Sequence, residues 1–201
     1  MGGGLPRGAL TEVVSAPTAG AGTLALKAIA AAHALGEAAA YLDLAAAFDP
    51  AYAARCGVAL DRLLVIRPQP CAQAAPILRD LVTGGGAGVV VLDGVETLLR
   101  APGGAVALAE ALPALRGALA RSDTVLLCLT RHADAAATDT ALPPSHAALR
   151  LHLAWCGWLR AWDDVAGYWT AATVLKHRYG PAGVTVTVAV RFDGVVDGDG
   201  A

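Results

Sequence analysis

The chain has 201 residues, of which 56% are hydrophobic and 16% charged, and its formal net charge is −2. This composition excludes a disordered chain and predicts a single globular domain with one substantial core. No apolar run reaches the roughly 18 residues of a membrane span, and the first residues lack the pattern of a signal peptide. We therefore expect a cytoplasmic protein without membrane contact, whose overall charge does not attract nucleic acid.

Extended apolar segments alternate with helical segments over the first 130 residues. The expected strands are Leu10–Ser15, Ala39–Leu44, Leu63–Ile66, Gly88–Asp93 and Thr124–Thr130. The expected helices run from the turn after Ser15 to about His33, onward from Asp49-Pro50, over Cys71–Val82 and over Gly104–Arg121. Asp followed by Pro is a typical cap and first residue of a helix. This alternation predicts an α/β fold with a mainly parallel β-sheet flanked by helices on both faces.

The pattern changes after residue 147, where no helical segment separates the strands. Leu149–Trp162, Tyr168–Arg178 and Val184–Phe192 read as three consecutive extended segments. Such segments fit an antiparallel extension on one edge of the sheet, at the C-terminal end. We therefore expect one domain over residues 1–201, with a parallel βα portion at 1–130, a β-rich edge portion at 147–193 and a tail at 194–201.

The four cysteines do not form a recognisable motif. They are Cys56, Cys71, Cys128 and Cys156, with no C-x-x-C spacing. A zinc site needs paired thiolates or imidazoles, and a disulfide scaffold is shorter and denser in cysteine. We expect reduced, buried thiols and no metal site.

The first βα turn is the usual phosphate-binding loop of a parallel α/β sheet. A working P-loop reads G-x-x-x-x-G-K-[ST], in which backbone amides surround the phosphates, Lys neutralises them and the hydroxyl holds Mg²⁺. In this turn only Gly20 occupies a motif position, because Ser15 replaces the first Gly, Ala21 the Lys and Gly22 the hydroxyl residue. Thr23 is displaced by one residue, and Lys27 lies more than a helical turn beyond the loop. A tight turn kept for folding is the favoured interpretation.

Nearly the whole chain resembles the core of the bacterial RecA family. The segments that carry the resemblance are Gly3–Gly8, Thr11–Val14, Leu24–His33, Tyr41–Asp43, Phe48–Ala53, Leu60–Leu64, Val89–Asp93, Ser122–Leu127 and Lys176–Arg178. Val89–Asp93 is similar to the family's Walker B strand, and Lys176-His177-Arg178 lies where the family has a basic-x-basic motif. The resemblance implies a RecA-type core.

The departures from the family pattern all concern ATP hydrolysis. Ala45 stands where the family has the catalytic carboxylate that orients the attacking water, and Arg131 stands where it has the Gln that senses the γ-phosphate. Asp93 is retained, but a lone acid at a strand end can be structural. Phosphoryl transfer depends on positioning and charge stabilisation. We therefore expect a pseudo-ATPase without catalytic residues or a cofactor.

The resemblance also bears on assembly and DNA binding. RecA proteins polymerise through a helix and strand that precede the core, whereas this chain begins at the core, so we expect no RecA-type filament. The family's two DNA-binding loops would correspond to residues 100–104 and 131–145. The second carries about as much acid as base, and phosphate contacts dominate non-specific DNA affinity. DNA binding is therefore expected to be weak or indirect.

The β-rich edge offers a candidate binding surface. Odd positions from Leu149 to Leu159, including Trp155, form a credible core face. Even positions place Arg and Trp on the opposite face, a mixture typical of binding hot spots and also able to stack on single-stranded bases. The candidate partner or DNA interface comprises Arg150, Trp158, Arg160, Trp162, Lys176 and Arg178. The alternative is that a helix or the tail covers this face.

Three classes of function remain open. The first is a non-catalytic accessory protein of DNA repair resembling the ImuA type of RecA paralogue, with SulA-like relatives, which works beside an error-prone polymerase in damage-induced translesion mutagenesis. Its partner would be a protein: the error-prone polymerase, RecA or the sliding clamp. The second is a RecA-like nucleotide- or single-strand-DNA-binding regulator of recombination. The third is an active ATPase with an unusual loop, which the missing groups disfavour.

Overall fold

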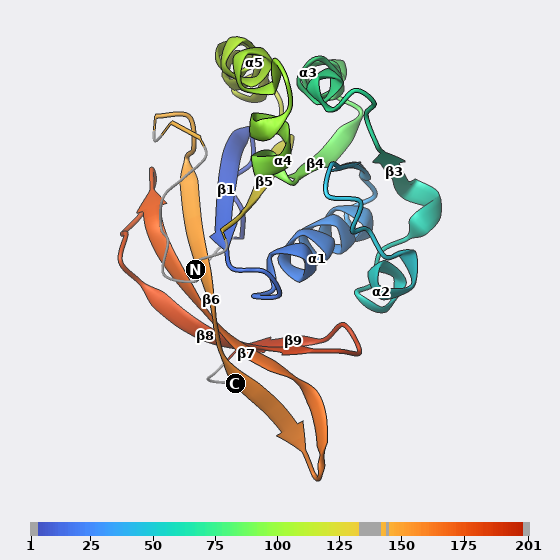
Figure 1. Ribbon diagram of the computed structural model, residues 1–201, viewed down its shortest axis with the longest axis vertical. Helices are drawn as coiled ribbons and strands as arrows, with labels where there is room; N and C mark the ends of the chain where they lie inside the picture. Colours follow the sequence, from blue (N-terminus) through green and yellow to red (C-terminus); the bar gives the residue numbers. More distant parts are fainter. Residues whose placement is uncertain (1–3, 133–141, 144, 199–201) are drawn as a thin grey trace.

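The computed structural model describes residues 4–132, 142–143 and 145–198. Its strands join in one sheet of order β3-β2-β4-β5-β1-β6-β7-β8-β9 (Figure 1). The strands are β1 Ala9–Ser15, β2 Ala38–Asp43, β3 Leu63–Ile66, β4 Ala87–Asp93, β5 Val125–Arg131, β6 Leu149–Ala161, β7 Asp164–His177, β8 Thr185–Arg191 and β9 Val196–Gly198. The helices are α1 Ala21–Ala34, α2 Pro50–Arg55, α3 Ala74–Gly84, α4 Val95–Arg100 and α5 Gly104–Leu119, with 3₁₀ turns at Leu60–Arg62 and Cys71–Gln73.

The sheet has a parallel and an antiparallel part. Strands β3, β2, β4, β5, β1 and β6 pair in parallel, and β6, β7, β8 and β9 pair antiparallel. The predicted mainly parallel sheet with an antiparallel extension at its C-terminal end is therefore confirmed.

Helices cover both faces of the parallel part, as predicted (Figure 1). Side chains of α1 and α2 pack with one face of the sheet, where Ile29 and Ala53 belong to the same buried cluster as Val91. Side chains of α3, α4 and α5 pack with the other, where Leu78 and Leu115 belong to the same buried cluster as Leu92. Burial on both faces explains why the central strands read as continuous apolar runs without alternation.

Two short elements were absent from the prediction. Helix α4 spans only Val95–Arg100, directly after the strand that ends at Asp93, and six residues give too few turns for a clear helical period. Strand β9, Val196–Gly198, pairs with β8 inside the segment expected to be a tail. The expectation of a tail beginning at residue 194 was wrong for these three residues.

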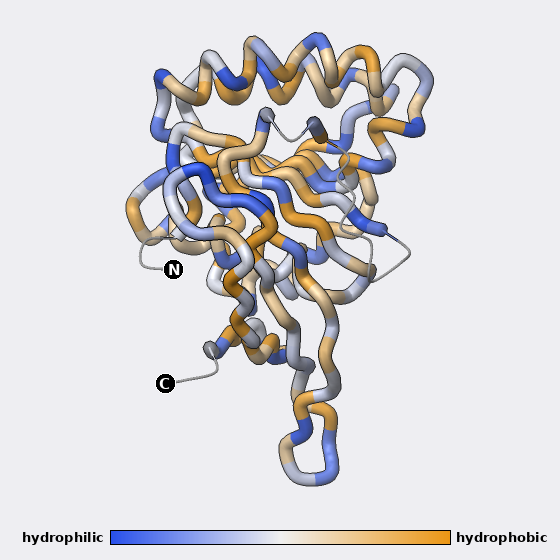
Figure 2. Tube along the Cα trace, turned by 90° about the vertical axis from the view of Figure 1, so that its left-hand side faces the viewer, coloured by the Kyte–Doolittle hydropathy of each residue, from blue (hydrophilic) through white to orange (hydrophobic). Residues whose placement is uncertain are grey.

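Strands β6 and β7 continue beyond the rest of the sheet as a protruding ribbon (Figures 1 and 2). A register shift between Trp155 and Gly157 places one extra residue, Cys156, in β6. An extra residue reverses the alternation of faces beyond it. Trp158 therefore lies on the same face as Trp155, and their ring centroids are 5.7 Å apart. Trp155 is 45% exposed because the neighbouring strand β1 pairs with β6 only as far as Leu153. The prediction that Trp155 is part of the core was wrong.

Candidate functional site

The turn between β1 and α1 lies at the carboxyl end of the parallel strands, as the sequence predicts. Gly20 caps α1 with φ of 99°, and Thr18 also has a positive φ, of 63°. From β7, the Thr170 hydroxyl donates a hydrogen bond of 2.8 Å to the carbonyl of Ala19. The antiparallel extension therefore supports the turn, although about 150 residues separate the two segments.

Thr23 and Lys27 both have partners outside the turn. The Thr23 and Tyr52 hydroxyls are 2.9 Å apart and share a hydrogen bond. The Lys27 ammonium donates to the carbonyl of Cys56 at 3.2 Å. Lys27 thus contacts the segment that follows α2, in agreement with the expectation that it does not replace the missing P-loop lysine.

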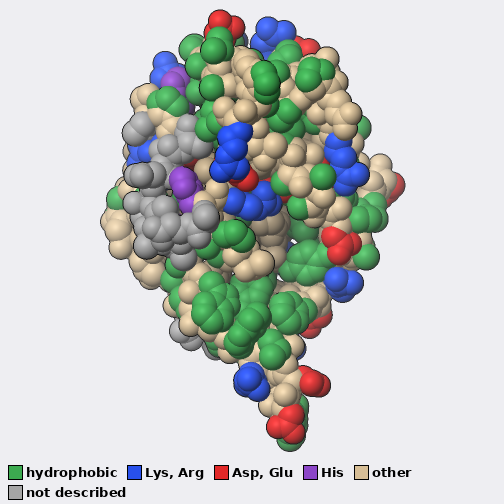
Figure 3. Space-filling view, in the orientation of Figure 1, with side chains coloured by type: hydrophobic (Ala, Val, Ile, Leu, Met, Phe, Trp, Pro, Cys, Tyr) green, Lys and Arg blue, Asp and Glu red, His purple; other side chains and the backbone are tan. Residues whose placement is uncertain are grey.

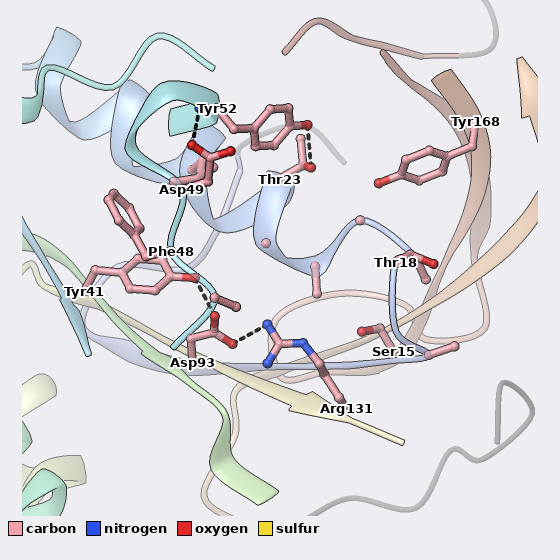
Figure 4. A pocket seen from close by; sticks show the side chains of 17 residues that line it. Ser15, Thr18, Thr23, Tyr41, Phe48, Asp49, Tyr52, Asp93, Arg131 and Tyr168 are labelled. Atoms are coloured by element: carbon pink, nitrogen blue, oxygen red, sulfur yellow. Dashed lines mark hydrogen bonds and ion pairs between the residues drawn. The ribbon is translucent and has the colours of Figure 1, made fainter. Parts of the chain in front are cut away.

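Asp93, at the end of β4, is the centre of a buried polar cluster (Figure 4). The Tyr41 hydroxyl donates a hydrogen bond of 2.7 Å to Asp93 Oδ2. Arg131 Nη2 lies 2.6 Å from Asp93 Oδ1. The Arg131 backbone amide donates to Glu96 Oε2 at 3.1 Å. Because β4 and β5 are neighbours, their carboxyl ends bring these side chains together.

Burial governs the proton affinity of this cluster. It raises the pKa of the Asp93 carboxyl above its usual value, against the lowering effects of the Tyr41 hydrogen bond and the Arg131 charge. Burial, reinforced by the Asp93 charge, also raises the pKa of the Tyr41 hydroxyl far above its usual value. Tyr41 is therefore a hydrogen-bond donor at neutral pH.

The segment after β2 is organised by a different acid. Asp43 accepts hydrogen bonds from the backbone amides of Ala47 and Phe48, and pairs with Arg67 Nε at 2.9 Å. Ala45 lies beside the end of β4, because a Cβ built on Gly94 would be 3.4 Å from the Ala45 methyl group. The position expected to carry a catalytic carboxylate in an active relative thus presents a methyl group at the sheet edge.

These elements enclose a pocket of about 360 Å³. Aromatic side chains from three elements and one loop line much of it: Tyr41, Phe48, Tyr52 and Tyr168. The Tyr168 side chain points into the pocket from β7, across from Thr23, and the Arg131 guanidinium lies between Asp93 and the turn (Figure 4). Burial raises the pKa of Tyr52 to about 12.

The structure places most of the predicted nucleotide-site residues around this one pocket. Those that line it are Ser15, Gly20, Ala21, Gly22, Thr23, Asp93 and Arg131; Ala45 lies next to it. Sequence reasoning missed Tyr168 as a pocket residue, because nothing in a β-strand pattern indicates contact with a turn so distant in the chain. Glu96 was also missed, although an acid two residues after the glycine that follows an acid-ended strand was a usable signal.

The six residues of the candidate interface do not form one surface. Trp158, Arg160 and Trp162 are exposed near the tip of the β6–β7 ribbon, whereas Arg178 is exposed at its other end. Lys176 is half-buried and donates to the carbonyl of Ala147 at 2.7 Å. Arg150 is 6% exposed and pairs with Glu12 at 2.9 Å. The prediction of Arg150 as a surface residue was wrong, because its register partner Glu12 on β1 is a buried acid that draws the guanidinium inward.

Other expectations have mixed outcomes. Cys56 and Cys128 are buried, but Cys71 is half-buried and Cys156 is exposed, so the prediction that all four thiols are buried was wrong.

The first expected DNA loop, 100–104, joins α4 to α5, whereas residues 133–141 and 144 of the second lie outside the described residues. Among the residues that the structure covers, no group of three His, Cys, Asp or Glu side chains could hold a metal ion. No described helix is long and apolar enough to span a membrane.

The strand order and the turn after β1 define a RecA-type α/β core. The crystal structure of the RadB recombinase matches it with a TM-score of 0.72, covering 97% of this chain and 92% of RadB. Their sequences are 20% identical, so this likeness establishes the fold alone.

The sequence comparisons identify the family. The family model of the RecA N-terminal domain matches residues 1–129, and the chain belongs to the RecA family. It is 31% identical over 200 residues to Protein RecA of Chlorobaculum tepidum, covering 89% of this chain and 58% of that protein. Protein RecA of Chloroflexus aurantiacus is 39% identical over 141 residues, covering 64% of this chain and 40% of the relative. The chain thus spans less than two thirds of the length of these RecA proteins.

Proposed function

We propose that this chain is a non-catalytic RecA-like accessory protein of DNA repair, which acts by binding protein partners rather than by hydrolysing ATP. Membership of the RecA family supports a role in DNA repair or recombination. The observation that carries the non-catalytic part is the ion pair between Arg131 and Asp93. Asp93 is the one acidic residue that this chain keeps at the positions the family uses for ATP hydrolysis, and here it is paired with Arg131 of the same chain.

The residues around the pocket do not fit magnesium-bound ATP, which the family implies. Asp93 already has two partners, Arg131 and Tyr41. The Thr23 hydroxyl is engaged by Tyr52. Ala21 supplies no cation for a phosphate, and Ala45 supplies no carboxylate for a water molecule. Since phosphoryl transfer depends on these charges, their joint loss supports a site without turnover.

The finer proposal is an accessory role of the ImuA type, beside an error-prone polymerase in damage-induced mutagenesis. The test is deletion of the gene, followed by measurement of survival and mutation frequency after DNA damage, with the wild-type gene as complementing control. We expect damage-induced mutagenesis to fall. Unchanged mutagenesis and unchanged survival would contradict the proposal. Affinity purification from damaged cells should recover an error-prone polymerase, RecA or the sliding clamp.

One observation favours a second candidate, a nucleotide- or single-strand-DNA-binding regulator of recombination. The pocket persists at about 360 Å³ and is lined by aromatic side chains that suit a planar ligand. The test is a titration of the protein with ATP, and with a labelled single-stranded oligonucleotide with and without ATP. Saturable binding of DNA only in the presence of ATP would favour the regulator, whereas flat titrations favour the accessory role.

A further inference from the structure

The end of the β6–β7 ribbon protrudes beyond the other strands of the sheet. Strand β1 pairs with β6 only as far as Leu153, and β8 pairs with β7 only from Gly167 onward. Residues 154–159 pair with 167–171 of β7, which also pair with β8, so the part of the hairpin with no third strand is residues 160–165, where Arg160 pairs with Val165 and Ala161 with Asp164. A two-stranded ribbon is marginally stable in water unless its apolar side chains are covered. Exposed apolar side chains at this end of the ribbon are therefore unfavourable for the isolated chain.

The exposed side chains of the ribbon are unusually large and apolar. Trp155 and Trp158 share a face because of the extra residue at Cys156, and they pack edge to face. Trp158 pairs across the ribbon with Tyr168, whose ring lies 6.3 Å from that of Phe192. Trp158 is thus the cross-strand neighbour of a residue that also lines the pocket. Hydrophobic side chains form a continuous patch above the protruding end (Figure 3).

Trp162 occupies the apex in a strained conformation. Ala161 pairs with Asp164, which leaves Trp162 and Asp163 as a two-residue loop. Trp162 has φ of 58° and is 100% exposed. Glycine or asparagine is the usual residue where a hairpin loop needs positive φ, because a Cβ is disfavoured there. The indole at this position is fully exposed to water and so contributes no burial to the fold. Backbone strain of this kind commonly marks a functional site.

The charges at the apex decide between possible binding partners. Asp163 and Asp164 follow Trp162 directly, and Arg160 is the one basic residue among residues 160–165. All three are exposed, so the tip has a net charge of about −1 at neutral pH. Two carboxylates beside the indole repel the phosphates of nucleic acid and anionic lipid headgroups. They attract a surface that carries Lys or Arg around an apolar pocket.

We infer that the tip of the β6–β7 ribbon, residues 160–165, is a protein-docking element whose Trp162 inserts into an apolar pocket of a different protein, rimmed by Lys or Arg side chains. Trp155 and Trp158 would extend the contact along the ribbon. Tryptophan and arginine dominate binding hot spots, and Arg160 would contribute at the margin. The inference rests on the proposed function, because it assumes that the chain works by partner binding.

The decisive variant is Trp162→Gly, because stability and docking should respond in opposite directions. Glycine accepts the positive φ, so the thermal unfolding midpoint should equal or exceed that of the wild type. Loss of the anchor should weaken partner binding at least tenfold. The matched control is Tyr179→Ala, which removes an aromatic side chain that is 69% exposed at the other end of the ribbon; binding should change less than twofold.

The partner is identified by placing the photo-crosslinking residue p-benzoylphenylalanine at position 162 in DNA-damaged cells. The cross-linked protein is then purified, and its affinity is measured for the wild type, Trp162→Gly, Asp163→Lys with Asp164→Lys, and Tyr179→Ala. We expect the charge-reversed variant to bind at least tenfold more weakly, and wild-type binding to weaken with added salt. Thirty-residue oligothymidine and vesicles of phosphatidylcholine with phosphatidylglycerol serve as direct probes, and neither should shift the Trp emission.

Several results would overturn the inference. They are cross-links only to nucleic acid, to a second copy of this chain or to nothing; binding of either direct probe through Trp162; and wild-type affinity in Trp162→Gly or in the charge-reversed variant. None of these would restore ATP hydrolysis or remove a repair phenotype, so the proposed function would stand. Conversely, ATP turnover by the wild-type protein would contradict the proposed function without changing the cross-link at position 162.

Discussion

Arg131 Nη2 lies 2.6 Å from Asp93 Oδ1, so the carboxyl ends of the neighbouring strands β4 and β5 are joined by an ion pair inside the pocket. Asp93 is 1% exposed, and an unpaired carboxylate at such a site would be costly. Arg131 therefore has a structural role that is independent of any ligand. It makes the charge of Asp93 tolerable in a pocket that lacks the P-loop lysine.

Removal of Arg131 should destabilise the protein more than removal of both partners. Arg131→Ala leaves Asp93 buried without its cation and should lower the free energy of unfolding by about 2 kcal/mol, less than for a fully buried pair because Arg131 is partly exposed. Combining it with Asp93→Asn should recover about half of that loss. Urea unfolding measures both, with Arg100→Ala on the exposed end of α4 as control. A double variant as unstable as Arg131→Ala would contradict this account.

The raised pKa of Asp93 predicts a specific dependence of stability on pH. The folded state binds this proton more tightly than the unfolded state, so the contribution of Asp93 is most favourable at low pH. It falls as pH rises from the unfolded value near 3.8 through the raised folded value. Asp93→Asn removes this titration. The unfolding free energy of Asp93→Asn minus that of the wild type should therefore increase with pH across this window, measured by urea unfolding at a series of pH values. A constant difference would show that the effects of Arg131 and Tyr41 on the pKa balance that of burial, and a decreasing difference that they outweigh it; either would contradict the raised pKa.

Restoring the P-loop lysine alone should not restore ATP hydrolysis. Ala21→Lys supplies a cation, but Ala45 still cannot orient a water molecule and Asp93 stays paired with Arg131. We expect release of phosphate from ATP in the presence of Mg²⁺ to stay at the level of a protein-free control for both the wild type and Ala21→Lys. Titration with labelled ATP measures binding separately from turnover. Turnover by either protein would contradict the non-catalytic proposal.

The sequence predicts the parallel part of this fold well because burial on both faces leaves a strong local signal. Val89–Asp93 is apolar until its terminal acid, and Asp49-Pro50 is a local start signal for a helix; both predictions are confirmed. The antiparallel ribbon is predicted less accurately, since a single extra residue at Cys156 brings Trp158 to the face of Trp155, and Trp155 is exposed because it lies beyond the last residue of β6 that pairs with β1. A bulge leaves no compositional mark in one sequence.

The residues of the candidate site also fall into a group that the sequence predicts and a group that it does not. Its positions after β1 and β4 follow from the chain order of strands in a parallel sheet, so Gly20 and Asp93 could be predicted. The contacts that give the pocket its character could not, because they join distant segments: Thr23 with Tyr52, Tyr168 with the turn, and Arg131 with Asp93. Such pairings depend on register and side-chain direction, which local patterns do not encode.

The buried pair of Glu12 and Arg150 should be the most sensitive polar contact of the β1–β6 junction. Arg150 Nε lies 2.9 Å from Glu12 Oε2, and its Nη2 donates to the carbonyl of Leu142, whose amide donates to Glu12 Oε1 at 3.3 Å. Arg150→Ala should lower the free energy of unfolding by about 3 kcal/mol, because the buried Glu12 would lose its ion pair with Arg150. Replacing both residues with apolar ones, Glu12→Leu with Arg150→Met, should cost less than Arg150→Ala alone. Urea unfolding with an unchanged m-value measures this difference, and a double variant that is less stable than Arg150→Ala would show that the pair contributes more than compensation of charge.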